Sequence, residues 1–193
     1  MTSKSQQQSN VCGCFLLVSL GVLATLAAIT LPFDSSKKAK ESKAESKAKT
    51  YVGTMIRAQY NYLLERGTFL NDLEEMNLIV KYSDTSDIEG AIKTHSYSIS
   101  ATKNAVFHYG IARSDVYQTK YILFIPWRVK LKLKSYVSGV FIVPATQFDA
   151  NASEYEMTTS GILCETNSPS TNKPAEPTYK DGILAYGEGT RSP

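Results

Sequence analysis

Histidine side chains are the first candidates for catalysis or metal binding, and this chain has only two, His95 and His108. Neither has a second Cys, His or carboxylate at the spacing that is typical of a metal site. The sequence also lacks the G-x-S-x-G, H-E-x-x-H and phosphate-loop glycine patterns of common enzymes. Both histidines are therefore predicted to be structural or surface residues, and we predict no catalytic, metal-binding or cofactor-binding residue. A catalytic group assembled from dispersed residues would not be visible in this pattern search.

Three cysteines could form disulfide bonds, but their positions do not favour pairing. Cys12 and Cys14 lie at the start of a long apolar segment, whereas Cys164 is alone in the rest of the chain. A disulfide framework needs paired cysteines within one domain. No disulfide is therefore predicted, and Cys164 is expected to be unpaired.

A basic segment, Arg128–Lys134 (RVKLKLK), alternates four cations with apolar residues. On a β-strand, this two-residue period would place all four cations on one face. Such a face could bind acidic glycans or nucleic acid by charge, or its lysines could protect an exposed strand from pairing with other strands. We favour the second interpretation and expect no nucleic-acid partner.

The N-terminal part of the chain is strongly apolar. Residues 1–10 form a polar leader, and the next 23 residues, 11–33, contain no charged side chain. A helix needs about 20 apolar residues to cross a bilayer core, so residues 11–33 are predicted to form a transmembrane helix. A cleaved signal is disfavoured because its apolar core is usually about 7 to 15 residues long. We therefore expect the chain to bind a membrane through this segment.

A stem rich in Lys, Ala and Glu, residues 34–50, follows the apolar segment. Residues 37–49 contain six Lys and two Glu, and opposite charges at i,i+4 spacing stabilise a helix. We expect a solvated helical stem, with contact between its lysines and anionic lipid head groups as an alternative. Pro32 lies inside this continuous helical pattern and predicts a kink.

Residues 51–193 are predicted to form one soluble domain, which begins with the end of the long helix. Mostly apolar residues recur there at three- and four-residue spacing and form one stripe along the helix. Gly67 is expected to end the helix. The residues of this stripe are Val52, Met55, Ile56, Gln59, Tyr60, Leu63 and Leu64. Asn71 followed by Glu74 has the pattern of a helix cap and predicts a short helix over residues 72–76.

Runs that alternate or are rich in β-branched residues predict strands in the second half of the chain. These runs are residues 96–99, 121–125, 129–134, 137–143 and 161–164. One long helix followed by strands with short connections predicts an α+β fold, with the helix packed on an antiparallel sheet of about four strands. The expected core joins Val52, Met55, Ile56, Tyr60 and Leu63 to Val129, Leu131, Leu133, Val140 and Ile142. Residues 168–178, which include three prolines, are expected to form an extended C-terminal loop.

Several short motifs, in order along the chain, resemble one known family. They are Ala27-Ala28-Ile29-Thr30-Leu31-Pro32, Thr50-Tyr51-Val52-Gly53, Arg57-Ala58-Gln59, Leu64-Glu65-Arg66-Gly67-Thr68-Phe69, Ser96-Tyr97-Ser98-Ile99, Leu133-Lys134-Ser135-Tyr136-Val137-Ser138-Gly139-Val140-Phe141 and Ile162-Leu163-Cys164-Glu165. From about residue 21 onward, this order resembles the type IV pilin-like G/H family of cyanobacterial pilins and pseudopilins. The resemblance implies a pilin-like fold, in which the first half of a long helix spans the membrane and the second half packs on a sheet.

The sequence departs from the family pattern at positions that the resemblance links to processing and assembly. Counted from Pro32, Asn10 stands where the processing site would need Gly, and Phe15 stands where pilins usually carry Glu. No processing site is therefore recognisable. Similar proteins often place a Cys at the position of Tyr186, as a partner for the Cys that matches Cys164, and this pairing is not expected here.

The resemblance implies a minor pilin or pseudopilin, which is a membrane-anchored structural or accessory subunit of a pilus or type II secretion-like system. Its partners would be other pilins or pseudopilins and inner-membrane assembly proteins. Two alternatives remain: an unprocessed single-pass membrane protein whose pilin-like domain binds a partner protein or polysaccharide, and a membrane-tethered enzyme. The expected location is the inner (plasma) membrane, with the soluble domain on the periplasmic side. The charge rule opposes this orientation, because one Lys precedes the apolar segment and six follow it closely.

Overall fold

The computed structural model describes the backbone of residues 9–83, 88–122 and 124–193, and the side chains of residues 35–81, 89–121 and 124–193. Helix α1 is Ser9–Arg66, and the chain divides into two compact units, residues 1–40 and residues 41–193. Residues 1–8 and the side chains of residues 9–34, which include Asn10, Cys12, Cys14 and Phe15, lie outside the described residues. Helix α1 continues through Pro32, where a kink was predicted. Among the side chains that are described, no helix is long and apolar enough to cross a membrane.

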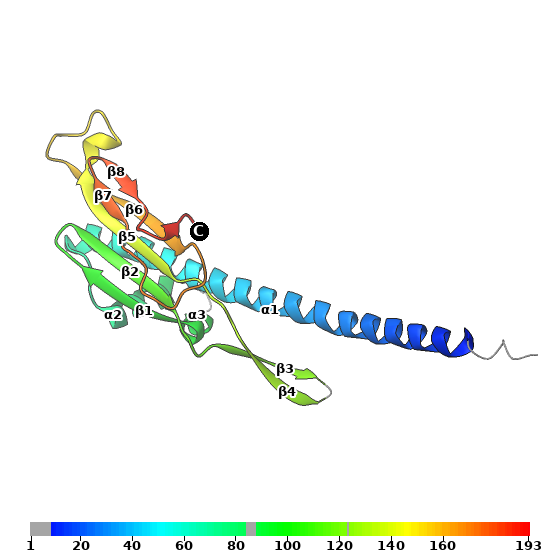
Figure 1. The fold of residues 1–193 in the computed structure, drawn as a ribbon. Helices are drawn as coiled ribbons and strands as arrows, with labels where there is room; N and C mark the ends of the chain where they lie inside the picture. The colour runs from blue at the N-terminus through cyan, green and yellow to red at the C-terminus, as the bar shows by residue number, and fades with distance from the viewer. Residues whose placement is uncertain (1–8, 84–87, 123) are drawn as a thin grey trace, which may run out of the picture. The chain divides into compact units, whose positions relative to one another are not determined.

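The unit formed by residues 41–193 is α+β, and its described strands include a five-stranded antiparallel sheet (Figure 1) in the order β1-β2-β5-β6-β9. The sequence predicted about four strands, so the class is confirmed and the strand number is corrected. After α1, the elements are α2 Leu73–Ser83, α3 Ile88–Thr94, β1 His95–Ala101, β2 Ala105–Ala112, β3 Tyr117–Ile122, β4 Ile125–Lys130, β5 Tyr136–Pro144, η1 Ala145–Gln147, β6 Met157–Thr166, β7 Thr178–Lys180, β8 Ile183–Ala185 and β9 Thr190–Arg191. Strands β3 and β4 pair with each other, as do β7 and β8.

The C-terminal part of α1 buries the predicted stripe and ends where the sequence indicates. Gly67 has a φ of 70°, which glycine adopts without strain, and its N–H donates to the Leu63 carbonyl at 2.8 Å. The buried Gln59 side chain exchanges two hydrogen bonds with the backbone of Leu70, which ties the following loop to the helix. Leu64 was wrongly assigned to the stripe, because its side chain is 85% exposed.

Helix α2 begins one residue later than predicted and is longer. The Asp72 carboxylate, and not the Asn71 side chain, accepts hydrogen bonds from the N–H groups of Glu74 and Glu75, at 2.7 and 3.0 Å. Asn71 instead accepts a hydrogen bond from the N–H of Ala101, at 3.0 Å, and so joins the loop to the end of β1. Asp and Asn are about equally good helix caps. The hydrogen bond from Ala101 engages the Asn71 side chain, so Asp72 caps the helix instead.

Two strand predictions are corrected in the region of residues 117–135. Residues 121–125 do not form one strand, because the chain turns between β3 and β4 within them. Residues 129 and 130 belong to β4, but residues 131–135 are not in a strand. Strand β2, by contrast, was not predicted: its residues AVFHYGIA are mostly buried on both faces, so the polar-apolar alternation is missing.

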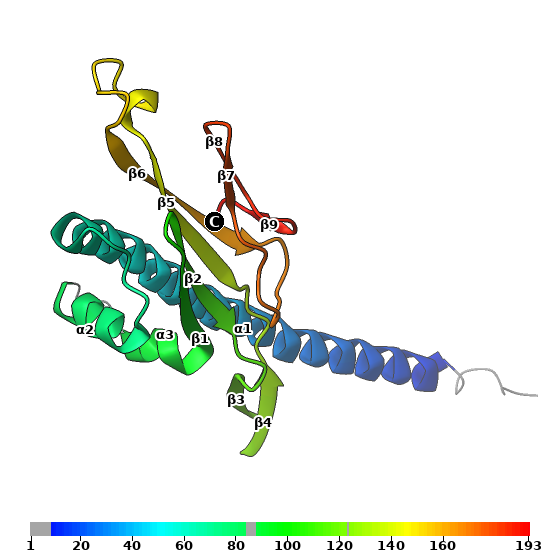
Figure 2. The ribbon, with the colours of Figure 1, turned by 90° about the vertical axis from the view of Figure 1, so that its left-hand side faces the viewer.

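Both faces of the sheet are covered, as Figure 2 shows. Helix α1 covers one face, where Ile56, Tyr60 and Leu63 pack with Val140 and Ile142, as predicted. On the opposite face lies a second cluster made by Tyr109, Val137 and Cys164 with Phe107, Ile111 and Ile162. The predicted core is partly corrected, since Leu131 and Leu133 pack against Ala44 and Ala112, while Val129 lies in hairpin β3–β4.

Candidate functional site

Segment 131–135, which contains the C-terminal half of the basic segment, is not in a strand, and side chains of α1 accept the hydrogen bonds that a neighbouring strand would accept. The N–H of Lys132 donates to Glu41 Oε1 at 2.7 Å, and the N–H of Lys134 donates to Glu45 Oε1 at 3.0 Å. Four residues of helix rise about 6 Å, and two residues of extended chain span about 6.6 Å. The i,i+4 glutamates therefore match the repeat of alternate backbone N–H groups.

Buried and exposed side chains alternate along this segment, as the predicted two-residue period requires. Leu131 and Leu133 are buried, whereas Lys132 is exposed. The predicted single face of four cations is wrong, because Arg128 lies in β4, where its guanidinium covers the Tyr117 ring, and Lys134 is drawn into the domain. Sequence reasoning missed the role of Glu41 and Glu45, because each bonds to a backbone N–H that is distant in the sequence.

Glu165 on β6 joins the basic segment to the C-terminal strand. Its Oε1 lies 2.6 Å from Lys134 Nζ and 3.0 Å from Arg191 Nε. Burial disfavours the charged carboxylate, but the hydrogen bonds from these two cations outweigh it and hold the pKa of Glu165 below its usual range. At Glu45, burial is the larger effect and raises the pKa, although the hydrogen bond from the Lys134 backbone opposes it.

Ser135 connects this network to the C-terminal loops. Its buried hydroxyl donates to the Ser170 carbonyl at 2.6 Å and accepts from the Ala112 N–H at 3.0 Å. Its backbone N–H donates to Thr166 Oγ1 at 3.1 Å, and its carbonyl accepts from the Thr166 N–H. One residue thus satisfies four polar groups of the domain, and the Pro-rich loop is held against the sheet.

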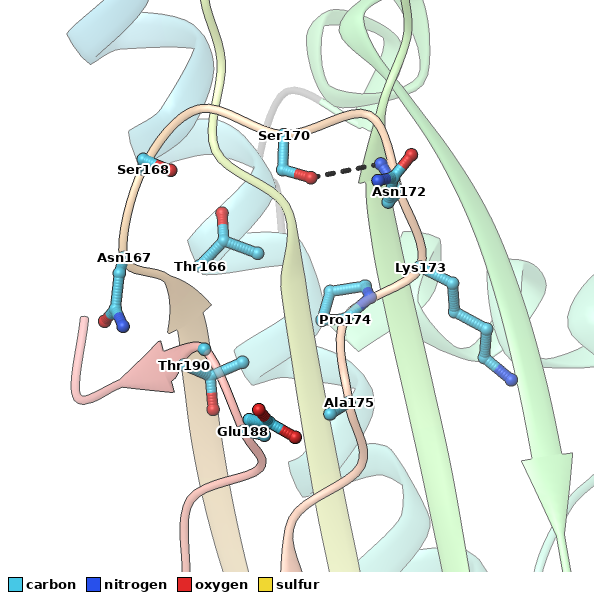
Figure 3. Close-up of a pocket in the computed structure, with 11 residues that line it drawn as sticks. Thr166, Asn167, Ser168, Ser170, Asn172, Lys173, Pro174, Ala175, Glu188 and Thr190 are labelled. Carbon is cyan, nitrogen blue, oxygen red and sulfur yellow. Dashed lines mark hydrogen bonds between the residues drawn. The ribbon is translucent and has the colours of Figure 1, made fainter.

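A polar pocket of about 210 Å³ lies between the Pro-rich loop and the turn before β9 (Figure 3). It is lined by Thr166, Asn167, Ser168, Ser170, Asn172, Lys173, Pro174, Ala175, Glu188, Gly189 and Thr190. The Asn172 N–H donates to Ser170 Oγ at 3.1 Å, and Lys173 Nζ lies 4.0 Å from the centre of the Tyr109 ring. Hydroxyl and amide groups dominate the lining, which contains neither His nor Cys. The pocket is therefore suited to hold a polar group of a peptide or sugar by hydrogen bonds.

The two histidines lie in the interior of the domain. His95 Nε2 is 2.9 Å from the Lys134 carbonyl, and His108 Nδ1 is 2.9 Å from Ser138 Oγ. Burial lowers the pKa of His108 to about 3 and also lowers that of His95, so both are neutral at pH 7. No cluster of three or more His, Cys, Asp or Glu within the described residues could hold a metal ion.

Cys164 is a free, buried thiol on β6. Burial raises its pKa, and hydrogen bonds involving Thr190 and the Gly187 backbone oppose that shift. Tyr186 stands where similar proteins often carry the second Cys. It directly precedes Gly187, whose backbone contacts Cys164. Tyr186 itself is about half exposed.

A long helix that covers an antiparallel sheet, with the C-terminal segment on the other face, defines a pilin-like class of α+β protein. Residues 45–187 match the sequence model of the family described as type IV pilin-like G and H, and this match covers most of the chain. The chain therefore belongs to this family, and the resemblance predicted from its motifs is confirmed. No curated protein and no solved structure gave a significant match.

Proposed function

We propose that this chain is a membrane-anchored minor pilin or pseudopilin, which serves as an accessory subunit of a pilus or type II secretion-like system. The observation that carries the proposal is the family match over residues 45–187, together with the uncharged segment 11–33, which lies earlier in the same N-terminal helix. In this arrangement residues 11–33 anchor the chain in the inner membrane. The domain then lies on the periplasmic side, where it can contact other pilins and assembly proteins.

An accessory position is supported by the residues near the N-terminus. Pilins usually carry Glu at the position of Phe15, and a phenylalanine cannot form the ion pair that this carboxylate makes with a neighbouring subunit. Without a Gly at Asn10, we expect the polar leader to remain attached. Polar groups buried without partners cost about 1 to 3 kcal/mol each, so packing this leader inside a filament is unfavourable. A subunit that caps or initiates a filament does not bury its N-terminus on every side.

The polar pocket supports a second candidate function. A permanently anchored protein could use the hydroxyl and amide groups around Ser170 and Thr190 to bind a partner protein or polysaccharide. The same domain and anchor serve this function without any assembly into filaments. No aromatic side chain lines the pocket, so a stacked sugar ring is disfavoured relative to a peptide segment.

Quantitative mass spectrometry of sheared surface filaments and of the remaining membranes tests the accessory role. We expect most copies in the membrane fraction and only trace amounts relative to the major pilin in the filament fraction. Protease added to spheroplasts should degrade the domain, which would establish its periplasmic side. An abundance in filaments similar to that of the major pilin would contradict the accessory role, and a domain that resists protease until the membrane is dissolved would contradict the orientation.

A further inference from the structure

Hairpin β3–β4 exposes large apolar side chains at its tip. The exposed fractions are 97% for Phe124, 74% for Tyr121, 64% for Ile125 and 58% for Trp127. Figure 1 shows the hairpin extending away from the five-stranded sheet, and within the described residues its strands pair only with each other. Phe124 has a φ of 68°, a left-handed conformation in which Gly or Asn would be favoured over a bulky residue. Folding stability alone does not account for a fully exposed phenylalanine at this position.

Positively charged side chains follow the apolar tip on both strands. The register pairs Lys120 with Trp127 and Thr119 with Arg128, so cations begin within a few residues of the turn. Residues 117–130 contain three cations and no Asp or Glu. An aromatic tip followed by cations is the order found at a membrane surface, where aromatic rings occupy the head-group level and Lys or Arg contacts anionic lipids.

Hairpin β3–β4 continues from the end of segment 131–135 that bonds to Glu41, where the domain unit begins. Segment 131–135 follows α1 from Glu45 to Glu41 as it approaches the hairpin. From residue 131 to Phe124, an extended chain spans up to about 23 Å. The tip therefore projects well beyond the part of the domain that holds segment 131–135 (Figure 1).

We propose that the tip of hairpin β3–β4 inserts into the head-group region of an anionic lipid bilayer, as a second membrane contact of the domain. This inference rests on the membrane anchoring of the proposed function, and the two can fail separately. The lipid surface explains the exposed aromatic residues and the uniformly positive flank together, because burial of the tip removes apolar area from water while the cations meet anionic head groups.

Trp127 is the only tryptophan in the chain and lies in the hairpin, so its fluorescence reports directly on the tip. The full chain is reconstituted in vesicles of phosphatidylcholine and phosphatidylglycerol, with and without brominated acyl chains that quench tryptophan. We expect a blue-shifted emission, quenching by the brominated lipids, and weaker quenching without phosphatidylglycerol. The double substitution Phe124→Ser and Ile125→Ser should remove most of the quenching. The matched control is Phe148→Ser, which changes an exposed aromatic residue elsewhere in the domain and should leave the quenching unchanged.

Flotation of the same vesicles distinguishes insertion of the hairpin tip from anchoring by the N-terminal segment. If the chain floats with the vesicles but Trp127 is not quenched, the hairpin proposal is wrong and the N-terminal anchor stands. If flotation is lost in the double variant, the hairpin binds lipid but the N-terminal segment is not an anchor. If Trp127 becomes shielded from water-soluble quenchers only as protein density rises, the tip contacts another protein copy, and the lipid proposal is overturned.

Discussion

At the residue scale, His108 shows how burial determines chemistry. The buried ring lies on β2, with Nδ1 2.9 Å from Ser138 Oγ. The second nitrogen, Nε2, is buried without a hydrogen-bond partner among the described residues. Burial disfavours the imidazolium form, which lowers the pKa from 6.5 to about 3. The neutral, enclosed ring agrees with the structural role that the sequence predicted for this histidine.

The lowered pKa of His108 predicts acid sensitivity of the domain. Below its ordinary pKa of 6.5 the unfolded chain binds a proton that the folded chain excludes, so stability falls as pH falls. Between pH 6.5 and 5.5 the loss from this residue should be roughly 1 kcal/mol. His108→Gln removes the titrating group and should flatten the pH dependence of urea unfolding, measured on the full chain in detergent. His95 remains in both proteins, and equal slopes for the two would contradict the assignment.

Sequence patterns located some of the important residues and missed others for a physical reason. The identities of Asn10 and Phe15 could be read directly, because their significance depends on their distance from Pro32 along the chain. The partners of Glu41 and Glu45 could not, because each bonds to a backbone N–H about ninety residues away. Local spacing indicates a helix face but does not say which distant segment it meets.

At the element scale, segment 131–135 shows that a two-residue period is not sufficient for a strand. Alternation requires only that one side of an extended segment is buried, and here a helix provides both the apolar contacts and the hydrogen-bond acceptors. In hairpin β3–β4 the sequence prediction placed one strand over residues 121–125, where the chain turns between two strands. An apolar run concealed its turn, because Phe124 occupies the left-handed position where glycine would have marked it.

The glutamate contacts predict that Glu45 stabilises the attachment of segment 131–135 to α1. Glu45→Ala leaves the N–H of Lys134 without its acceptor in a partly buried site, and should lower the free energy of unfolding by about 1 to 3 kcal/mol. Glu45→Gln keeps an acceptor oxygen and should lose less. Glu65→Ala, on an exposed position of the same helix, is the matched control and should stay within about 0.5 kcal/mol of wild type. Chemical unfolding followed by circular dichroism measures all three, and an equal loss for Glu45→Ala and Glu65→Ala would contradict the attachment.

At the scale of the whole molecule, the fold class could be predicted because it depends on the order of elements. One helix stripe followed by strand-forming runs leaves few arrangements other than a helix on an antiparallel sheet. The short strands β7, β8 and β9 were not predicted, because two or three residues carry no period. These strands belong to the C-terminal segment that covers the second face of the sheet and forms the polar pocket.

The most direct test of the proposed accessory subunit is the N-terminus of the membrane-bound chain, determined by intact mass and N-terminal sequencing. The account predicts a chain that keeps its polar leader, because Asn10 replaces the glycine expected at a processing site. The Asn10→Gly variant, which restores that glycine, provides the matched comparison. A wild-type chain that begins near Val11 would show that processing occurs without the glycine, and would contradict the account of a subunit retained in the membrane.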